Sequence, residues 1–134
     1  METSRASGLG TRRVLIVDDD WVIRHCIAET LREEGYEPLT AAHGAEALAV
    51  LRAGAGQPDV ILLDMHMPVM DGWAFAQEYR RLPGPHAPIV VITAAHDARE
   101  RVLEIGADGV LPKPFDLDQV IDAVQRCLEA SRPG

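Results

Sequence analysis

Short apolar runs that alternate with helix-like segments constrain the fold of this chain more than any other feature. Four such runs occupy residues 14–17, 60–63, 89–92 and 110–112. The central run, 60–63, is rich in branched side chains and too short for a helix, which is typical of a strand buried on both faces. Strands that alternate with helices predict a parallel sheet covered on both sides, so we expect a doubly wound α/β domain.

The expected boundaries follow from spacing, caps and chain breakers. We expect helices at 21–34, 45–52, 72–81 and 97–105, and a last helix capped by Asp116. A second strand is expected at 37–41 and the last strand at 109–111. Pro38 and Pro112 indicate that these two strands lie at sheet edges, because proline cannot donate to a β-ladder. We assign 1–11 to a flexible tail, 12–130 to the domain and 131–134 to a C-terminal tail or linker start.

Polar side chains follow the four apolar runs. In chain order they are Asp18–Asp20, Asp64, Thr93 and Lys113, which is the only lysine among 13 basic residues. The carboxyl ends of parallel strands meet at one edge of a sheet, so these groups should converge. Clustered carboxylates favour a hard divalent cation such as Mg²⁺, with Mn²⁺ as an alternative. Asp64 is then the candidate nucleophile toward a phosphoryl group, and Thr93 and Lys113 are candidates to bind its oxygens.

Each of these groups also has an ordinary structural interpretation. Asp18–Asp20 could form an exposed turn with a helix cap, and Asp64 could cap the next turn. Thr93 could bond to backbone, and Lys113 could be a solvated lysine. His66 and His96 could indicate a transition-metal site, but two histidines on different loops without a spaced partner are a weak signal. The coincidence of four suitable strand ends in one chain favours the phosphoryl-site interpretation.

Composition excludes several classes of protein. The net charge of −8, from 21 acidic and 13 basic residues, argues against nucleic acid as a direct partner. No apolar run approaches the ~20 residues that span a bilayer, and the amino terminus has no secretory pattern. Cys26 and Cys127 fall in helical patterns and are predicted to be small core residues. A cytoplasmic protein without a disulfide framework or membrane partner is therefore expected.

Four motifs together resemble the receiver domain of two-component response regulators. They read VLIVDDD, LLDMHMPVMDG, VITA and KPF, occur in this order, and cover nearly the whole chain outside the tails. The resemblance implies a flavodoxin-like five-stranded parallel sheet of order 2-1-3-4-5 with five helices. It also implies that Asp64 accepts a phosphoryl group from a phosphohistidine on a sensor histidine kinase or a histidine phosphotransfer protein.

The same resemblance implies a role for each site residue. Asp18, Asp19 and Asp64 would bind Mg²⁺ together with the backbone carbonyl of His66. Thr93 and Lys113 would bind the phosphoryl group, and the peptide bond before Pro114 would be cis. The chain departs from the family at Val110, where an aromatic residue usually rotates inward on phosphorylation. A valine cannot make that rotation, so the usual link from the site to the surface is in question.

Other functions stay open at this level. Asp18 to Val22 also fits the D-x-D-x-V/T signature of haloacid-dehalogenase-like phosphatases, although only one helix follows Lys113 and no substrate cap is evident. A receiver-shaped binding module that is never phosphorylated is a further alternative. In the receiver interpretation the domain is a signalling module, not an enzyme, and acts through a protein target or an output domain absent from this chain. It would be a monomer or a weak homodimer.

Overall fold

The computed structural model of this chain describes residues 11–54 and 57–131. Within them lie five strands: β1 (Arg13–Val17), β2 (Glu37–Ala41), β3 (Val60–Asp64), β4 (Ile89–Ala94) and β5 (Gly109–Lys113). The five α-helices are α1 (Trp21–Glu33), α2 (Gly44–Arg52), α3 (Gly72–Arg81), α4 (Ala98–Ile105) and α5 (Leu117–Ser131). The tail expected at the amino terminus lies outside the described residues except for Thr11, and the end of the C-terminal tail lies outside them as well.

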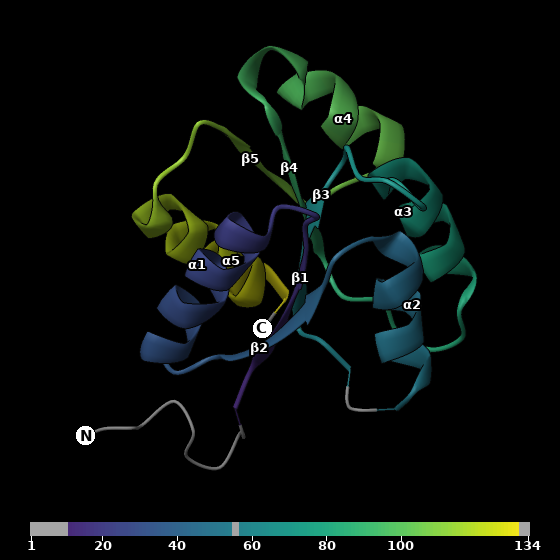
Figure 1. Cartoon of the computed structure of the whole chain (residues 1–134), viewed down its shortest axis with the longest axis horizontal. Coiled ribbons are helices and arrows are strands. Elements are labelled where there is room, and N and C mark those ends of the chain that lie inside the picture. Colours follow the sequence, from purple (N-terminus) through teal and green to yellow (C-terminus); the bar gives the residue numbers. More distant parts are fainter. Residues whose placement is uncertain (1–10, 55–56, 132–134) are drawn as a thin grey trace.

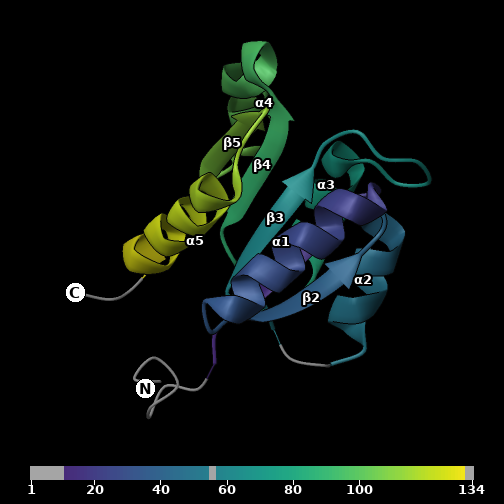
Figure 2. The same cartoon turned by 60° about the vertical axis from the view of Figure 1, so that its left-hand side comes forward.

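The strands form one parallel sheet in the order β2-β1-β3-β4-β5. Helices α1 and α5 pack on one face of the sheet, and α2, α3 and α4 pack on the other (Figure 1). All neighbouring strands pair in parallel, and Figure 2 shows β2, β3 and β4 running in the same direction with α1 and α5 in front of the sheet. This is the doubly wound, flavodoxin-like fold of order 2-1-3-4-5 that the sequence predicts.

The central strands divide their side chains between two cores. On the α1/α5 face the buried residues of β1, β3 and β4 are Val14, Ile16, Val60, Leu62, Val90 and Ile92. On the α2/α3/α4 face they are Leu15, Val17, Ile61, Leu63, Ile89 and Val91. Every position of the apolar runs 14–17, 60–63 and 89–92 thus packs against a helix layer, which explains why these runs are apolar without alternation.

Three details differ from the prediction. Strand β5 continues through Pro112 to Lys113, because its pairing with β4 extends to the pair Ala94–Lys113. A 3₁₀ turn over Ala95–Asp97 precedes α4, which begins at Ala98. Cys26 is exposed, whereas Cys127 is buried as predicted. Cys26 is exposed because the core-facing stripe of α1 consists of Ile27, Ala28 and Leu31.

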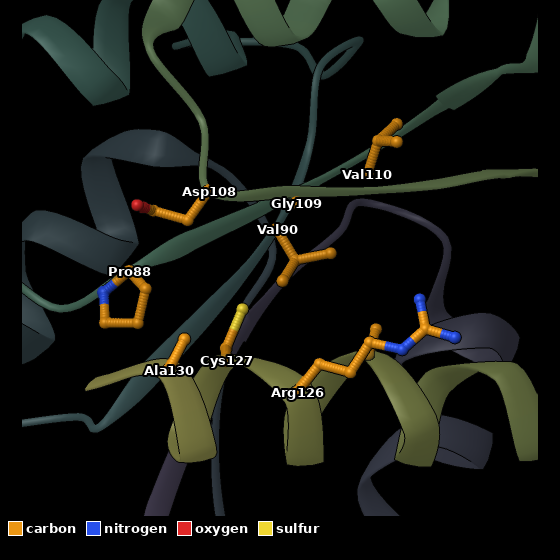
Figure 3. Close-up of a pocket in the computed structure, with 9 residues that line it drawn as sticks. Pro88, Val90, Asp108, Gly109, Val110, Arg126, Cys127 and Ala130 are labelled. Carbon is orange, nitrogen blue, oxygen red and sulfur yellow. The ribbon is translucent and has the colours of Figure 1, made fainter. Parts of the chain in front are cut away.

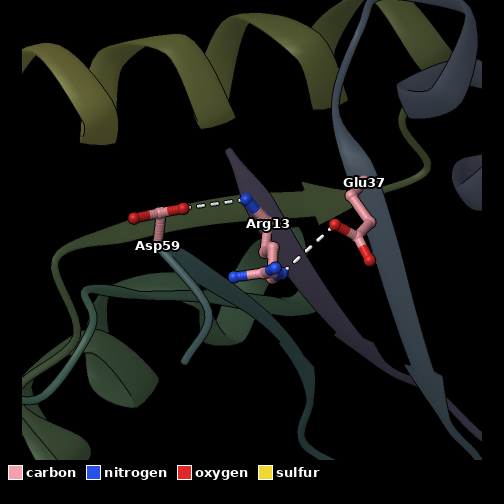
Figure 4. A network of polar contacts seen from close by, with 3 residues as sticks. All are labelled: Arg13, Glu37 and Asp59. Atoms are coloured by element: carbon pink, nitrogen blue, oxygen red, sulfur yellow. Dashed lines mark hydrogen bonds and ion pairs between the residues drawn. The ribbon is translucent and has the colours of Figure 1, made fainter. Parts of the chain in front are cut away.

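The amino-terminal ends of the first three strands are tied together by polar contacts (Figure 4). The backbone N–H of Arg13 donates to Asp59 Oδ2 at 2.8 Å, and Arg13 Nε donates to Glu37 Oε1 at 3.1 Å. The Arg13–Glu37 pair is exposed to solvent, so it adds well under 1 kcal/mol. These contacts help to fix strand register at the edge of the sheet opposite the strand ends that carry Asp64 and Thr93.

Gly72, the first residue of α3, is tightly packed against the loop that follows β3. A Cβ on Gly72 would lie 2.6 Å from Met65 Sδ and 2.8 Å from the backbone Cα of Met65. Because backbone cannot yield locally, we expect Gly72→Ala to lower the free energy of unfolding by about 1–3 kcal/mol in urea titrations. Gly109→Ala is the matched control, since its Cβ would meet Val90 at an ordinary 3.5 Å. Equal losses in the two variants would contradict this packing argument.

Candidate functional site

Three carboxylates meet at the carboxyl ends of β1 and β3. Asp18 follows β1 and Asp64 ends β3, and these side chains are buried, with residue exposures of 1% and 2%. Asp19 is exposed beside them. One oxygen from each of Asp18, Asp19 and Asp64 lies within 4.8 Å of the others. The three residues therefore form a compact acidic cluster at the strand end predicted to hold the site.

Asp20 has a different role from its two neighbours. Its Oδ1 accepts from the backbone N–H groups of Val22 at 3.0 Å and Ile23 at 3.2 Å, so it caps α1. Its own N–H donates to Asp18 Oδ1 at 2.9 Å. Among the described residues the buried Asp18 Oδ2 finds no hydrogen-bond partner. The run of three aspartates thus divides into one helix cap and two members of the acidic cluster.

Lys113 and Thr93 reach the same place from β5 and β4. Lys113 Nζ lies 3.4 Å from Asp64 Oδ1, and its side chain remains 40% exposed. Thr93 is buried, and its Oγ1 has no hydrogen-bond partner in the part of the chain that the structure describes. The peptide bond between Lys113 and Pro114 is cis. Residues from the carboxyl ends of three other strands, β1, β4 and β5, therefore lie at the same edge of the sheet as Asp64.

Burial makes ionisation of the two central carboxyls unfavourable. Desolvation, reinforced by the charge of Asp18, raises the pKa of Asp64 from 3.8 to about 6, although Lys113 and the backbone N–H of His66 act in the opposite direction. Desolvation also raises the pKa of Asp18 above its ordinary value. The site is therefore short of positive charge at neutral pH.

The donor set of this cluster fits a hard divalent cation. Its ligands are carboxylate oxygens, which Mg²⁺ and Mn²⁺ prefer, and the unpartnered Asp18 Oδ2 is a buried acceptor that such an ion would satisfy. Neither His66 nor His96 belongs to a group of metal-capable side chains within the described residues. The geometry thus favours an oxygen-ligand cation over the transition-metal site considered from the sequence.

His66 makes an aromatic contact that could not be predicted from its position in the sequence. Its ring meets the edge of Trp73 in α3, with ring centroids 5.4 Å apart. Trp73 Nε1 in turn donates to Glu104 Oε1 of α4 at 2.7 Å. The loop after Asp64 is thereby in contact, through one tryptophan, with the carboxyl-terminal end of α4. The separation of 31 residues between Trp73 and Glu104 leaves no local pattern that could have predicted this contact.

Val110 is the second residue of β5, three positions before Lys113, and borders a cavity beside α5. Figure 3 shows its side chain pointing away from α5, whereas Val90 and Cys127 point into a cavity of about 400 Å³ between the sheet and α5. This cavity is bordered by Pro88 and Gly109, near the first residues of β4 and β5, and so lies at the opposite end of these strands from Thr93 and Lys113. It is therefore separate from the candidate site.

Comparison with protein families identifies the same region of the chain. The model of the response regulator receiver domain matches residues 14–125. Response regulator MprA of Mycobacterium avium is 37% identical over 123 residues, which cover 90% of this chain and 53% of that protein. MprA of Mycobacterium tuberculosis H37Rv is also 37% identical over 123 residues and is covered to 52%. The chain spans about half the length of these curated relatives.

Solved structures show the same similarity in three dimensions. Chemotaxis response regulator CheY4 of Vibrio cholerae superposes with a TM-score of 0.78 at 38% identity, covering 88% of this chain and 99% of that one. Response regulator TrrA of Thermotoga maritima, solved in complex with Mg²⁺-BeF, gives a TM-score of 0.75 at 35% identity and covers 88% of this chain and 100% of that one. No helix of the described residues is long and apolar enough to cross a membrane.

The raised pKa of Asp64 predicts a pH-dependent gain in stability when its charge is removed. The folded metal-free protein holds the proton of Asp64 up to about pH 6, whereas the unfolded chain releases it near 3.8. Ionised Asp64 therefore opposes folding above pH 6, and this penalty disappears as the pH falls below 4. We expect Asp64→Asn to raise the free energy of unfolding by about 1–3 kcal/mol at pH 7.5 in EDTA, with no gain at pH 4.

Glu129→Gln, which removes an exposed carboxylate of α5, serves as the control. Its effect on the urea midpoint should be small at both pH values. If Asp64→Asn raises the free energy of unfolding equally at pH 4 and pH 7.5, the charge of Asp64 is not the source of the added stability.

Proposed function

Because this chain belongs to the response regulator receiver family, we propose that Asp64 accepts a phosphoryl group from a phosphohistidine of a partner protein. The observation that supports the proposal most directly is the position of Asp64 itself. Its carboxyl group ends a fully buried strand, within 3.4 Å of the Lys113 ammonium and beside the carboxylates of Asp18 and Asp19. The partner would be a sensor histidine kinase or a histidine phosphotransfer protein.

In the proposed reaction a carboxylate oxygen of Asp64 attacks the phosphorus atom of the phosphohistidine. The new P–O bond forms as the P–N bond breaks, and the electron pair of that bond stays on the imidazole nitrogen of the partner. Lys113 would leave its contact with Asp64 Oδ1 to pair with an oxygen of the transferred group. The unpartnered Thr93 hydroxyl would donate a hydrogen bond to another of these oxygens.

The acidic cluster has its own part in this proposal. Asp18, Asp19 and Asp64 would hold Mg²⁺, or Mn²⁺ in its place, with the backbone carbonyl of His66 as a further ligand. The bound ion supplies positive charge that offsets the repulsion between these carboxylates and the phosphoryl group. Asp18 Oδ2, a buried oxygen with no hydrogen-bond partner in the described part of the chain, supports this assignment.

Phosphorylation would change contacts with other proteins, either a separate target or an output domain of a longer regulator. The curated relatives are about twice the matched length, which is consistent with the second possibility. Val110 lacks the aromatic ring that usually follows the movement of the threonine, so the output route is expected to differ from the usual one. A cytoplasmic location is consistent with two cysteines that do not form a disulfide.

Intact-mass measurement after incubation with acetyl phosphate and Mg²⁺ tests the proposed function. We expect one added phosphoryl group, which should be absent in Asp64→Asn and in EDTA. Asp59→Asn is a matched control, because Asp59 lies near the amino-terminal end of the same strand, where its carboxylate accepts a hydrogen bond from the backbone N–H of Arg13. This variant should still be phosphorylated.

A missing adduct could reflect rapid hydrolysis, so binding of beryllofluoride with Mg²⁺ is the second measurement. A receiver that hydrolyses its phosphate quickly should still bind this mimic of the phosphoryl group. If neither an adduct nor beryllofluoride binding is found, the domain is a binding module that is not phosphorylated. Sustained turnover of a small phosphomonoester would instead point to a phosphatase.

A further inference from the structure

Asp18 is held by the protein at three of its four hydrogen-bonding groups. Its backbone N–H donates to the carbonyl of Ala41 at 3.1 Å, and its Oδ1 accepts from the N–H of Asp20 at 2.9 Å. Its backbone carbonyl accepts from Arg24 Nη1 at 2.7 Å. Only Oδ2 has no partner within the described chain, and this atom is buried. These contacts leave one oxygen of Asp18 for a ligand and fix its direction.

The contact with Arg24 is unusual for the place of that residue in α1. Arg24 lies in the first turns of the helix, where its N–H bonds to the carbonyl of Asp20. A cation near a helix amino terminus opposes the helix dipole, so this position is electrostatically unfavourable for an arginine. Helical side chains lean toward the amino terminus, which brings the guanidinium back to the Asp18 carbonyl. A short charge-assisted hydrogen bond offsets the unfavourable position.

We propose that Arg24 is a positioning residue of the cation site, which orients Asp18 and Asp19 by holding the peptide group that joins them. The proposal rests on the metal-binding part of the proposed function. Without a cation, repulsion from Asp64 pushes the loop after β1 away from the sheet, because Asp18, Asp19 and Asp64 all carry negative charge when ionised. The bond from Arg24 to the carbonyl between the two aspartates resists this movement. The ligands are then already in place when the ion arrives.

Positioning and simple electrostatics predict opposite effects for a neutral replacement of Arg24. If the guanidinium acted only through its charge, its removal would make the site more negative and cation binding tighter. If it acts by holding the peptide group, its removal loosens the loop and cation binding becomes weaker. Removal of residues that support metal ligands typically costs 10- to 100-fold in affinity, so we expect a loss of about tenfold.

The affinity for Mn²⁺ can be measured without any phosphoryl transfer, from the decrease in the EPR signal of the free ion as it binds. Competition with Mg²⁺ then gives the affinity for Mg²⁺. The variants are Arg24→Met, which keeps much of the length of the side chain, and Arg24→Lys, which keeps the charge but not the planar fork. Arg32→Met is the matched control, since Arg32 lies in the same helix and pairs with Glu29 at the surface. It removes the same charge without touching Asp18.

We expect the dissociation constant for Mn²⁺ to rise about tenfold in Arg24→Met and by a smaller factor in Arg24→Lys, and to stay within twofold in Arg32→Met. Unchanged or tighter binding by a folded Arg24→Met would overturn the proposal. If Arg24→Met does not fold, Arg24→Lys provides the test. Weaker Mn²⁺ binding by this variant would support the proposal, and unchanged binding would overturn it. If the wild-type protein binds neither Mn²⁺ nor Mg²⁺, the proposed metal site is wrong and this inference is wrong with it. If the wild-type protein binds the ion and Arg24→Met binds it equally well, only this inference is overturned.

Discussion

Charge repulsion between Asp18 and Asp64 and their desolvation oppose the folding of this domain. The packing of the strands that carry these two carboxyl groups holds them together. Both groups are buried, and neither has enough positive charge nearby to restore its ordinary pKa. Lys113 compensates only in part, because its ammonium remains partly in solvent. The pair is nevertheless fixed, because β1 and β3 are neighbouring strands whose side chains pack into a core on each face of the sheet. The free energy gained by burying apolar side chains along the strands therefore offsets the cost of burying the two carboxyl groups at their ends.

Two buried oxygens of different kinds have no hydrogen-bond partner among residues 11–54 and 57–131. Asp18 Oδ2 is a negatively charged acceptor when ionised, and Thr93 Oγ1 carries a proton that it can donate. Buried polar groups are almost always paired in folded proteins, so two such atoms at one edge of the sheet are more consistent with a binding site than with a purely structural role. They also differ in the ligand that would satisfy them. The aspartate suits a cation, and the hydroxyl suits an anionic oxygen, so the two atoms together suit a site that binds both.

The fold and the central residues of the site could be predicted from sequence because both depend on patterns that are local in the chain. Buried parallel strands are continuous apolar runs, and Asp64 and Lys113 are the first charges after two of them. The features that could not be predicted depend on how side chains are oriented in the folded structure or on strand pairing. The bond from Trp73 to Glu104 joins α3 to α4, and the exposure of Cys26 follows from which stripe of α1 faces the core. The hydrogen bond from Arg24 to Asp18 spans only six residues, but it is seen only when the direction of the arginine side chain is known. Strand β5 is also longer than predicted, because its pairing with β4 continues through Pro112 to Lys113.

The two prolines at the margins of the sheet limit how other proteins can join it. β2 contains Pro38 and β5 contains Pro112, and these five-residue strands are the two outer strands of the sheet. Each proline removes a backbone donor from its strand, and short strands that contain proline are poor templates for pairing with an additional strand. Growth of the sheet across a molecular boundary, by β-augmentation or edge-to-edge association, is therefore disfavoured at both sides. Helix surfaces and loops are then the favoured surfaces for contacts with other proteins, and their side chains can change without altering the register of the strands that hold Asp64.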